Sequence, residues 1–200
     1  MDWSLAHALN VFLVHHDAVE DPLKAYVDAA EVLFLALLAA LFALARGFSR
    51  APARRGAAAA GLSAVVALGI AQVLAKAVDR PRPFVAHPSG VHLFAPHAAD
   101  AGFPSDHATA SFAIAVAILL RSRRWGYLTL AMATVLCVGR VALGFHYPSD
   151  VLAGAALGAA VALALNAPPV RGPLHRAADR AGGLWDGAVN VALARLRGSP

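Results

Sequence analysis

The feature that most constrains this chain is a series of apolar stretches long enough to cross a lipid bilayer. A spanning α-helix needs about 20 mostly apolar residues, because the hydrocarbon core is about 30 Å thick. Of the 200 residues, 59% are hydrophobic and only 14% are charged, which is too apolar for a typical soluble domain. The sequence therefore predicts an all-α integral membrane helical bundle. Its five spanning helices are expected at about Tyr26–Ala45, Ala57–Val78, Ser105–Leu120, Tyr127–Leu143 and Ser149–Leu165.

Two further segments flank these five stretches. Residues 3–16 are apolar but too few to span a bilayer, so we expect an interfacial or half-inserted helix, or a sixth span if it inserts fully. Residues 169–200 mix arginines with apolar side chains and predict an amphipathic helix on the membrane surface. We therefore expect a single membrane domain over residues 1–168, followed by an amphipathic tail over residues 169–200.

The arginines predict the orientation in the membrane. Four lie between the first and second expected helices, three between the third and fourth, and five after the fifth. The positive-inside rule makes that side cytoplasmic, so the C-terminus is expected inside the cell and the N-terminus outside. Only five of the 17 basic residues break this trend. The twelve that follow it are Arg46, Arg50, Arg54, Arg55, Arg121, Arg123, Arg124, Arg171, Arg176, Arg180, Arg195 and Arg197.

Three short motifs meet on the expected outer face. They are KAVDRPRPF at Lys76–Phe84, FPSDH at Phe103–His107 and GRVALGFHYPSD at Gly139–Asp150. Their basic residues suit phosphate, because the planar fork of arginine binds phosphate oxygens through two parallel hydrogen bonds. The expected phosphate ligands are Arg82 and Arg140, with Arg80 and Lys76 as further candidates.

The second motif begins a helix, and helix N-termini bind anions. Pro104 suits the first helical position, where its missing N–H is not needed. The backbone N–H groups near Ser105 and Asp106 would then face outward, with the helix dipole favouring negative charge. The Ser105 hydroxyl can add a donor. This pattern predicts a phosphate cradle at the start of the third span.

Two histidines can supply the chemistry. His146 lies four residues before Asp150, and a carboxylate bonded to one ring nitrogen leaves the other free to attack phosphorus. His107, in the first turn of its helix, can protonate the leaving oxygen. The sequence has no Asp/Glu cluster suited to Mg²⁺ and no glycine-rich Walker loop. It therefore predicts phosphoryl transfer through a phosphohistidine, with arginines in place of a metal and without a cofactor.

Together the motifs resemble those of the phosphatidic acid phosphatase type 2 superfamily, which includes membrane lipid phosphatases and vanadium haloperoxidases. The family pattern is Lys-x6-Arg-Pro, Pro-Ser-Gly-His and Ser-Arg-x5-His-x3-Asp. The resemblance implies that His146 is the nucleophile, Asp150 its orienter and His107 the acid. It also implies phosphate binding by Arg82, Ser105 and Arg140.

Three departures from the pattern lie in the motifs of the outer face, and one of them is Gly139, which replaces the serine before Arg140. Lys76 is one residue too close to Arg82, which turns its side chain by about 100° on a helix, so Arg80 could supply the charge instead. Asp106 replaces the pattern's glycine. RPRPF, HAAD and FPSDH together resemble the bacitracin-resistance branch, the undecaprenyl-diphosphate phosphatases. That branch implies hydrolysis of a polyprenyl diphosphate lipid to the monophosphate on the outer face, which recycles the carrier for cell-wall synthesis.

The sequence is also compatible with other functions. The substrate could be phosphatidic acid or phosphatidylglycerophosphate, or the chain could be a non-catalytic phospholipid binder or transporter. The five predicted spans argue against a haloperoxidase-like oxidant, because the haloperoxidases of the superfamily that the motifs resemble are soluble. The pI near 10.1 does not indicate nucleic acid, because the charges lie at membrane helix ends. His87, His92 and His97 lack the carboxylates of a metal site and are expected to be interfacial or solvated. The oligomeric state is not predicted.

Overall fold

Helices form nearly all the regular structure in the described part of the chain. The computed structural model describes residues 1–45 and 51–197, so Arg46 and Arg50, counted above for the orientation, lie outside the described residues. The helices in these ranges are α1 (Asp2–Val14), α2 (Asp17–Ala43), α3 (Ala51–Val78), α4 (Pro83–Ala86), α5 (Asp106–Leu119), α6 (Arg123–Ala142), α7 (Pro148–Leu165) and α8 (Pro168–Arg197).

Four of the five predicted spans are long apolar helices. By length and composition, α2, α3, α6 and α7 can each cross a membrane, and α5 is a shorter apolar helix. α5 has 14 residues and extends about 21 Å at 1.5 Å per residue, against a hydrocarbon core of about 30 Å. The prediction of an all-α membrane bundle is confirmed. The third predicted span is a helix, but shorter than the others.

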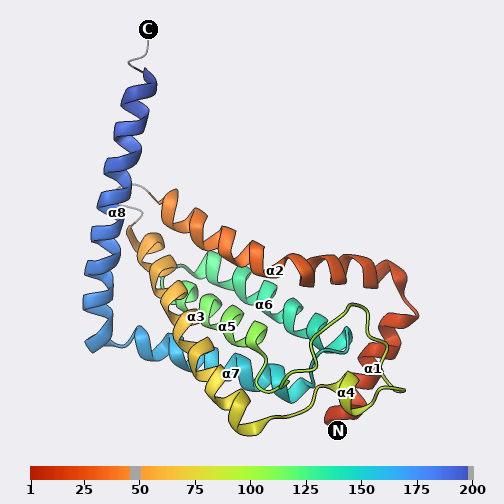
Figure 1. Ribbon diagram of the computed structural model, residues 1–200. Helices are drawn as coiled ribbons and strands as arrows, with labels where there is room; N and C mark the ends of the chain where they lie inside the picture. The colour runs from red at the N-terminus through yellow and green to blue at the C-terminus, as the bar shows by residue number, and fades with distance from the viewer. Residues whose placement is uncertain (46–50, 198–200) are drawn as a thin grey trace.

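The short helix α5 lies inside the bundle (Figure 1). It packs against α3, α6 and α7, and most of its residues from Ala108 to Ile118 are buried. Its N-cap is Ser105, whose hydroxyl accepts the N–H of Ala108. Pro104 therefore precedes the cap, and the prediction that it opens the helix is wrong. Pro148, by contrast, is the first residue of α7.

Glycines let α5 and α7 pack with their backbones in contact. Gly154 and Gly158 are one turn apart on α7, the small-xxx-small spacing that allows close helix approach in membranes. A Cβ at Gly158 would lie 2.1 Å from the carbonyl oxygen of Thr109, and one at Gly154 would lie 2.5 Å from that of Ser105. The Ser105 N–H also donates to the carbonyl of Asp150 at 3.0 Å. This contact joins the N-terminal ends of α5 and α7.

Replacing Gly158 with alanine is expected to destabilise the bundle. The added methyl group meets backbone atoms that cannot move aside, and such overpacking costs about 1–3 kcal/mol. Gly61→Ala and Gly69→Ala are matched controls on α3, because an added Cβ meets nothing within 4 Å at either position. Thermal unfolding in detergent should show a lower midpoint for Gly158→Ala alone. Equal midpoints for all three variants would contradict the packing described here.

The N-terminal helix α1 binds the loops at one end of the bundle rather than running through it. The side-chain amide of Asn10 donates to the carbonyls of His92 and Ala142 at 2.9 and 2.8 Å, and its oxygen accepts the N–H of His92 at 2.8 Å. Trp3 stacks on His87 with ring centroids 3.8 Å apart. Figure 1 shows α1, α4 and the α4–α5 loop gathered at this end. α1 therefore fixes the loops that follow α3.

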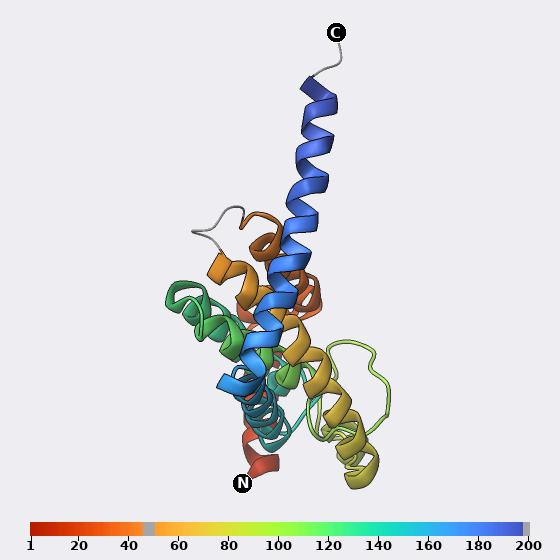
Figure 2. The same ribbon diagram turned by 90° about the vertical axis from the view of Figure 1, so that its left-hand side faces the viewer.

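The helix α8 lies at the opposite end of the bundle. Two ion pairs fasten it to the start of α3, Arg54–Asp186 at 3.0 Å and Arg55–Asp179 at 2.7 Å. Beyond these contacts it projects past the other helices (Figure 2). The predicted tail helix is thus present, and its place on a membrane surface stays a prediction.

Candidate active site

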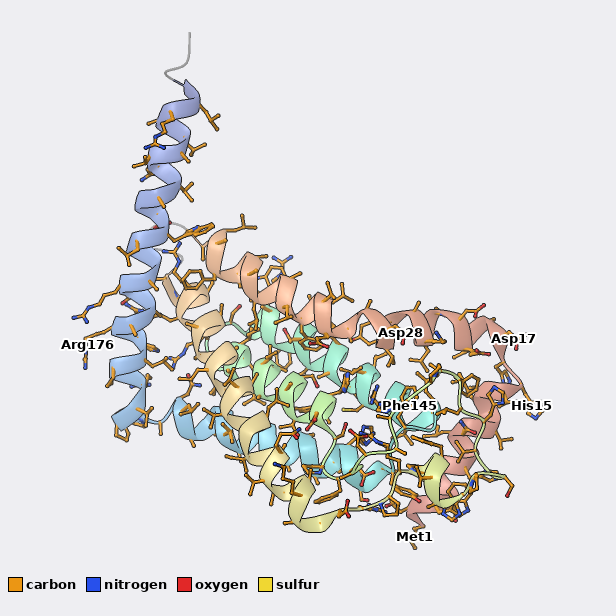
Figure 3. The ribbon with its side chains drawn as sticks, in the orientation of Figure 1. Met1, His15, Asp17, Asp28, Phe145 and Arg176 are labelled. Atoms are coloured by element: carbon orange, nitrogen blue, oxygen red, sulfur yellow. The ribbon has the colours of Figure 1, made fainter. Side chains whose placement is uncertain are left out.

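The three sequence motifs converge on one cavity at the end of the bundle that carries α1. The cavity has a volume of about 370 Å³. Phe145, next to the predicted nucleophile, lies at the same end as Met1, whereas Arg176 lies at the far end (Figure 3). Six of the nine predicted site residues line the cavity, and Arg80, Ser105 and Asp150 do not. The six are Lys76, Arg82, Asp106, His107, Arg140 and His146.

The ring of His146 is buried and its orientation is fixed. Its Nδ1 lies 2.9 Å from the carbonyl oxygen of Gly102, and because a carbonyl only accepts, Nδ1 carries the hydrogen. Nε2 of the neutral ring therefore bears the lone pair. It lies 3.0 Å from Nη1 of Arg82 and 3.4 Å from Nη2 of Arg140. The nucleophilic nitrogen thus faces two guanidinium groups suited to phosphate oxygens.

Asp150 does not make the hydrogen bond that the sequence predicts. Its Oδ2 lies 3.8 Å from Nδ1 of His146, beyond hydrogen-bond distance, and accepts the backbone N–H of Tyr147 at 2.8 Å instead. The bond that orients the ring comes from the Gly102 carbonyl. A backbone acceptor leaves no residue-type signal in the sequence, so this partner could not be predicted.

Arg80 and Ser105 also depart from their predicted roles. The guanidinium of Arg80 donates to Asp150 and to Asp2, both at 2.8 Å, and does not reach the cavity. The Ser105 side chain is fully buried as the cap of α5, and its N–H is bonded to the Asp150 carbonyl. The expected cradle at the start of α5 therefore lacks the Ser105 N–H.

The electrostatic surroundings keep His146 neutral. Burial lowers the pKa of His146 well below its ordinary value, and the charges of Arg140 and Arg82 lower it further. An imidazolium here would be both desolvated and repelled by two cations. The neutral form is also the one that can attack phosphorus.

The acid limb of kcat/KM is expected below pH 6.5, the ordinary pKa of histidine. A nucleophile with a lowered pKa keeps its free lone pair as the pH falls through that value. In Arg82→Gln one repelling cation is gone, so the limb should move to higher pH. Ionisation of the substrate is common to both profiles and cancels in the comparison. An acid limb that does not move between the two proteins would contradict this account.

Two loop residues bind the arginines of the site through hydrogen bonds. Neither was predicted from the sequence to be a site residue. Asp100 accepts Nε of Arg82 at 2.9 Å. Partial burial raises the pKa of Asp100, but the hydrogen bond and the charge of Arg82 outweigh this effect, so the pKa is lowered. Nε2 of His97 lies 2.8 Å from Nη2 of Arg140. Burial, followed by the charges of Arg82 and Arg140, lowers the pKa of His97. The HAAD stretch was the available signal, since it supplies both side chains.

A second, apolar cavity adjoins the first. It has a volume of about 680 Å³ and lies between α2, α3, α5 and α6, lined mainly by aliphatic and aromatic side chains. Gln72, Asp106 and His107 line both cavities. The Gln72 amide donates to Oδ2 of Asp106 at 2.8 Å. The polar cavity with His146 and the apolar cavity therefore meet beside His107.

Comparison with known proteins identifies the family. Residues 56–169 match the PAP2 superfamily. The chain belongs to this family. The match covers all three motifs described above and confirms the family predicted from them.

Relatives in the family carry names that differ in the lipid. The chain is 36% identical to undecaprenyl-diphosphatase BcrC of Bacillus subtilis over 70% of each chain. It is 39% identical to decaprenylphosphoryl-5-phosphoribose phosphatase of Mycobacterium tuberculosis over 74% of this chain and 76% of the relative. A transmembrane PAP2 type phosphatidylglycerolphosphate phosphatase from Bacillus subtilis, solved by crystallography, has a TM-score of 0.40 at 21% identity. The match covers 82% of this chain and 94% of the chain in that crystal structure.

Proposed function

We propose that this PAP2-family membrane lipid phosphatase hydrolyses undecaprenyl diphosphate to the monophosphate on the outer face of the cell membrane. The observation that carries the proposal is the junction of two cavities. One holds a neutral His146 between Arg82 and Arg140, and the adjoining one is apolar. A lipid phosphate needs both environments side by side, a basic one for the head group and an apolar one for the chain.

The site residues take the following roles in the proposed reaction. Nε2 of His146 attacks the terminal phosphorus, and the bond from that phosphorus to the bridging oxygen breaks. Arg82 and Arg140 stabilise the charge on the transferring oxygens. His107 gives a proton to the leaving oxygen. In the second step His107 takes a proton from water, the water oxygen bonds to phosphorus and the Nε2–P bond breaks, releasing phosphate.

Two features favour a diphosphate over a single phosphate. Lys76 lines the polar cavity despite its shortened spacing, and supplies a further charge that a second phosphate group can use. A relative named undecaprenyl-diphosphatase, BcrC of Bacillus subtilis, is 36% identical over 70% of this chain. The rival substrates are phosphatidic acid and phosphatidylglycerophosphate. A phospholipid binder or transporter would use the arginines but has no need of an oriented nucleophile.

The orientation is part of the same proposal. Asp17 and Met1 lie toward the end that holds the site, and Arg176 lies at the other end (Figure 3). The described arginines of the expected cytoplasmic side belong to the segments around the α2–α3 connection, the α5–α6 turn and α8. By the positive-inside rule the site then faces outward and the C-terminus lies in the cytoplasm.

The experiment is phosphate release by the purified protein from three lipids, undecaprenyl diphosphate, phosphatidic acid and phosphatidylglycerophosphate, with EDTA present. We expect fastest release from the polyprenyl diphosphate, and retention of the rate in EDTA because arginines supply the positive charge at the phosphate. Release only from glycerolipids would keep the site and discard the proposed substrate. A folded protein that binds these lipids and releases no phosphate would be a binder.

A further inference from the structure

Three charged side chains form a continuous chain beside His146, outside the cavity. Nη1 of Arg80 donates to Oδ1 of Asp150, and Nη2 of Arg80 donates to Oδ2 of Asp2, each at 2.8 Å. Asp150 is fully buried, whereas the side chains of Arg80 and Asp2 are 30% and 31% exposed. The planar guanidinium therefore bridges two carboxylates that are far apart in the sequence.

Neighbouring groups hold this bridge in one geometry. Ser149 donates its N–H to Oδ1 of Asp2 at 3.0 Å and its hydroxyl to Oδ2 at 2.5 Å. Nη1 of Arg80 also donates to the Ser149 hydroxyl at 2.6 Å. The guanidinium lies over the ring of Tyr147, 4.2 Å from its centroid. Such a bridge depends on the two-pronged shape of arginine, which lysine cannot reproduce.

The bridge ends next to the nucleophile. Asp150 accepts N–H donors on both oxygens, from Arg80 on Oδ1 and from Tyr147 on Oδ2, which is the pattern of an ionised carboxylate. Its Oδ2 lies 3.8 Å from Nδ1 of His146. When Nε2 bonds to phosphorus, the imidazole gains positive charge. A fixed carboxylate at this distance stabilises that charge most when it cannot turn away.

We propose that Arg80 and Asp2 are positioning residues for the phosphatase reaction, which anchor the carboxylate of Asp150 beside His146. The inference rests on the proposed function and goes beyond it, because it makes α1 part of the support of the active site. Arg80 between two carboxylates leaves the trio with a net negative charge. The imidazole therefore faces a carboxylate, while the cation stays outside the cavity.

The kinetic test uses Arg80→Gln, Arg80→Lys and Asp2→Asn. Both Arg80→Gln and Asp2→Asn are expected to lower kcat about ten- to a hundredfold, the rate equivalent of one charge-assisted hydrogen bond. KM should change little, because neither side chain lines the cavity. Arg80→Lys should keep part of the rate. The double variant Asp2→Asn/Arg80→Gln should be no slower than Arg80→Gln alone, since either change breaks the same chain.

The pH profile separates a positioning role from a merely structural one. The titratable or charged groups facing Asp150 are Asp2 from α1, Arg80 from the α3–α4 segment, and His146 and Tyr147 just before α7. Without the cation of Arg80, Asp150 protonates more readily, so the acid limb of kcat should move to higher pH in Arg80→Gln. Removing the like charge of Asp2 should move it to lower pH. A structural defect would lower the rate without moving the limb.

The control is Asp179→Asn, which breaks an equally short ion pair with Arg55 at the far end of the bundle and should leave kcat unchanged. Each variant is first checked for a monodisperse peak and a wild-type melting midpoint. If the wild type is active, and if Arg80→Gln and Asp2→Asn keep its kcat and its acid limb, this inference is overturned while the proposed function stands. A wild type that releases no phosphate from any lipid would overturn the proposed function and this inference with it.

Discussion

Phosphate release is expected to fall by at least about 10⁴-fold when His146 is replaced by glutamine, because the reaction then has no nucleophile. Glutamine preserves most of the buried volume of the ring, although it does not reproduce the bond from Nδ1 to the Gly102 carbonyl. What it lacks is the lone pair of Nε2, which lies between Arg82 and Arg140. The loss is therefore expected in kcat, with lipid binding retained.

The measurement combines the initial rate with a trap for the intermediate. Wild-type protein quenched in alkali during turnover of lipid labelled in its terminal phosphate should carry acid-labile label, as a phosphohistidine does, and His146→Gln should carry none. His16→Gln is the control, since His16 is an exposed residue at the start of α2. Near-normal turnover in His146→Gln, or label that persists there, would contradict the assignment of the nucleophile.

The four long helices could be predicted because hydropathy is a local property of the sequence. The apolar stretches around α2, α3, α6 and α7 appear in the structure with most ends shifted by at most four residues. The starts of α2 and α3 are earlier than predicted by nine and six residues. The bounds of α5 were predicted to within one residue at each end, but its position inside the bundle was not predicted. Its residues are buried by other helices rather than by lipid, and lipid tails are as apolar as leucine side chains. An apolar stretch therefore does not reveal which of the two surrounds it.

Four central residues of the cavity could also be predicted, but the hydrogen-bond partners of the site residues could not. Arg82, His107, Arg140 and His146 gather as expected, because each lies in or beside a motif at the same end of a helix. The direction of the Arg80 side chain depends on the backbone conformation just before it. Asp79 has a positive φ of 43°, so helical geometry ends before Arg80 and no longer predicts the direction of its side chain. Lys76 is still within α3 and does line the cavity.

One partner of Arg80 comes from a segment that no motif marks. Asp2 meets Arg80 only because α1 docks on the end of the bundle, through contacts such as those of Asn10. His97 and Asp100 lie in a loop whose path depends on that docking. Long-range polar pairs of this kind depend on the assembled fold, and single residues such as Asp2 carry no periodic signal.

Arg140→Gln is expected to lower kcat about 10²- to 10³-fold, as the loss of one preorganised donor to a developing charge does. Arg140 is buried, 6% exposed, and lies over the ring of Phe145 at 4.5 Å. One Nη2 atom serves both His97 and His146. Its Nε has no hydrogen-bond partner among the described residues. That atom is buried, whereas the guanidinium as a whole lines the cavity beside His146, where it is available for a phosphate oxygen.

Lysine at the same position distinguishes charge from shape. Arg140→Lys keeps the positive charge but loses the planar fork, so if the fork holds two phosphate oxygens at once, its kcat should lie near that of Arg140→Gln. If charge alone matters, lysine should restore most of the rate. Arg124→Gln is the matched control, an exposed arginine at the other end of the same helix α6, and should turn over normally. Wild-type kcat in Arg140→Gln would mean that Arg82 and Lys76 bind the transferring phosphate without it, and the site would have to be rebuilt around those two residues.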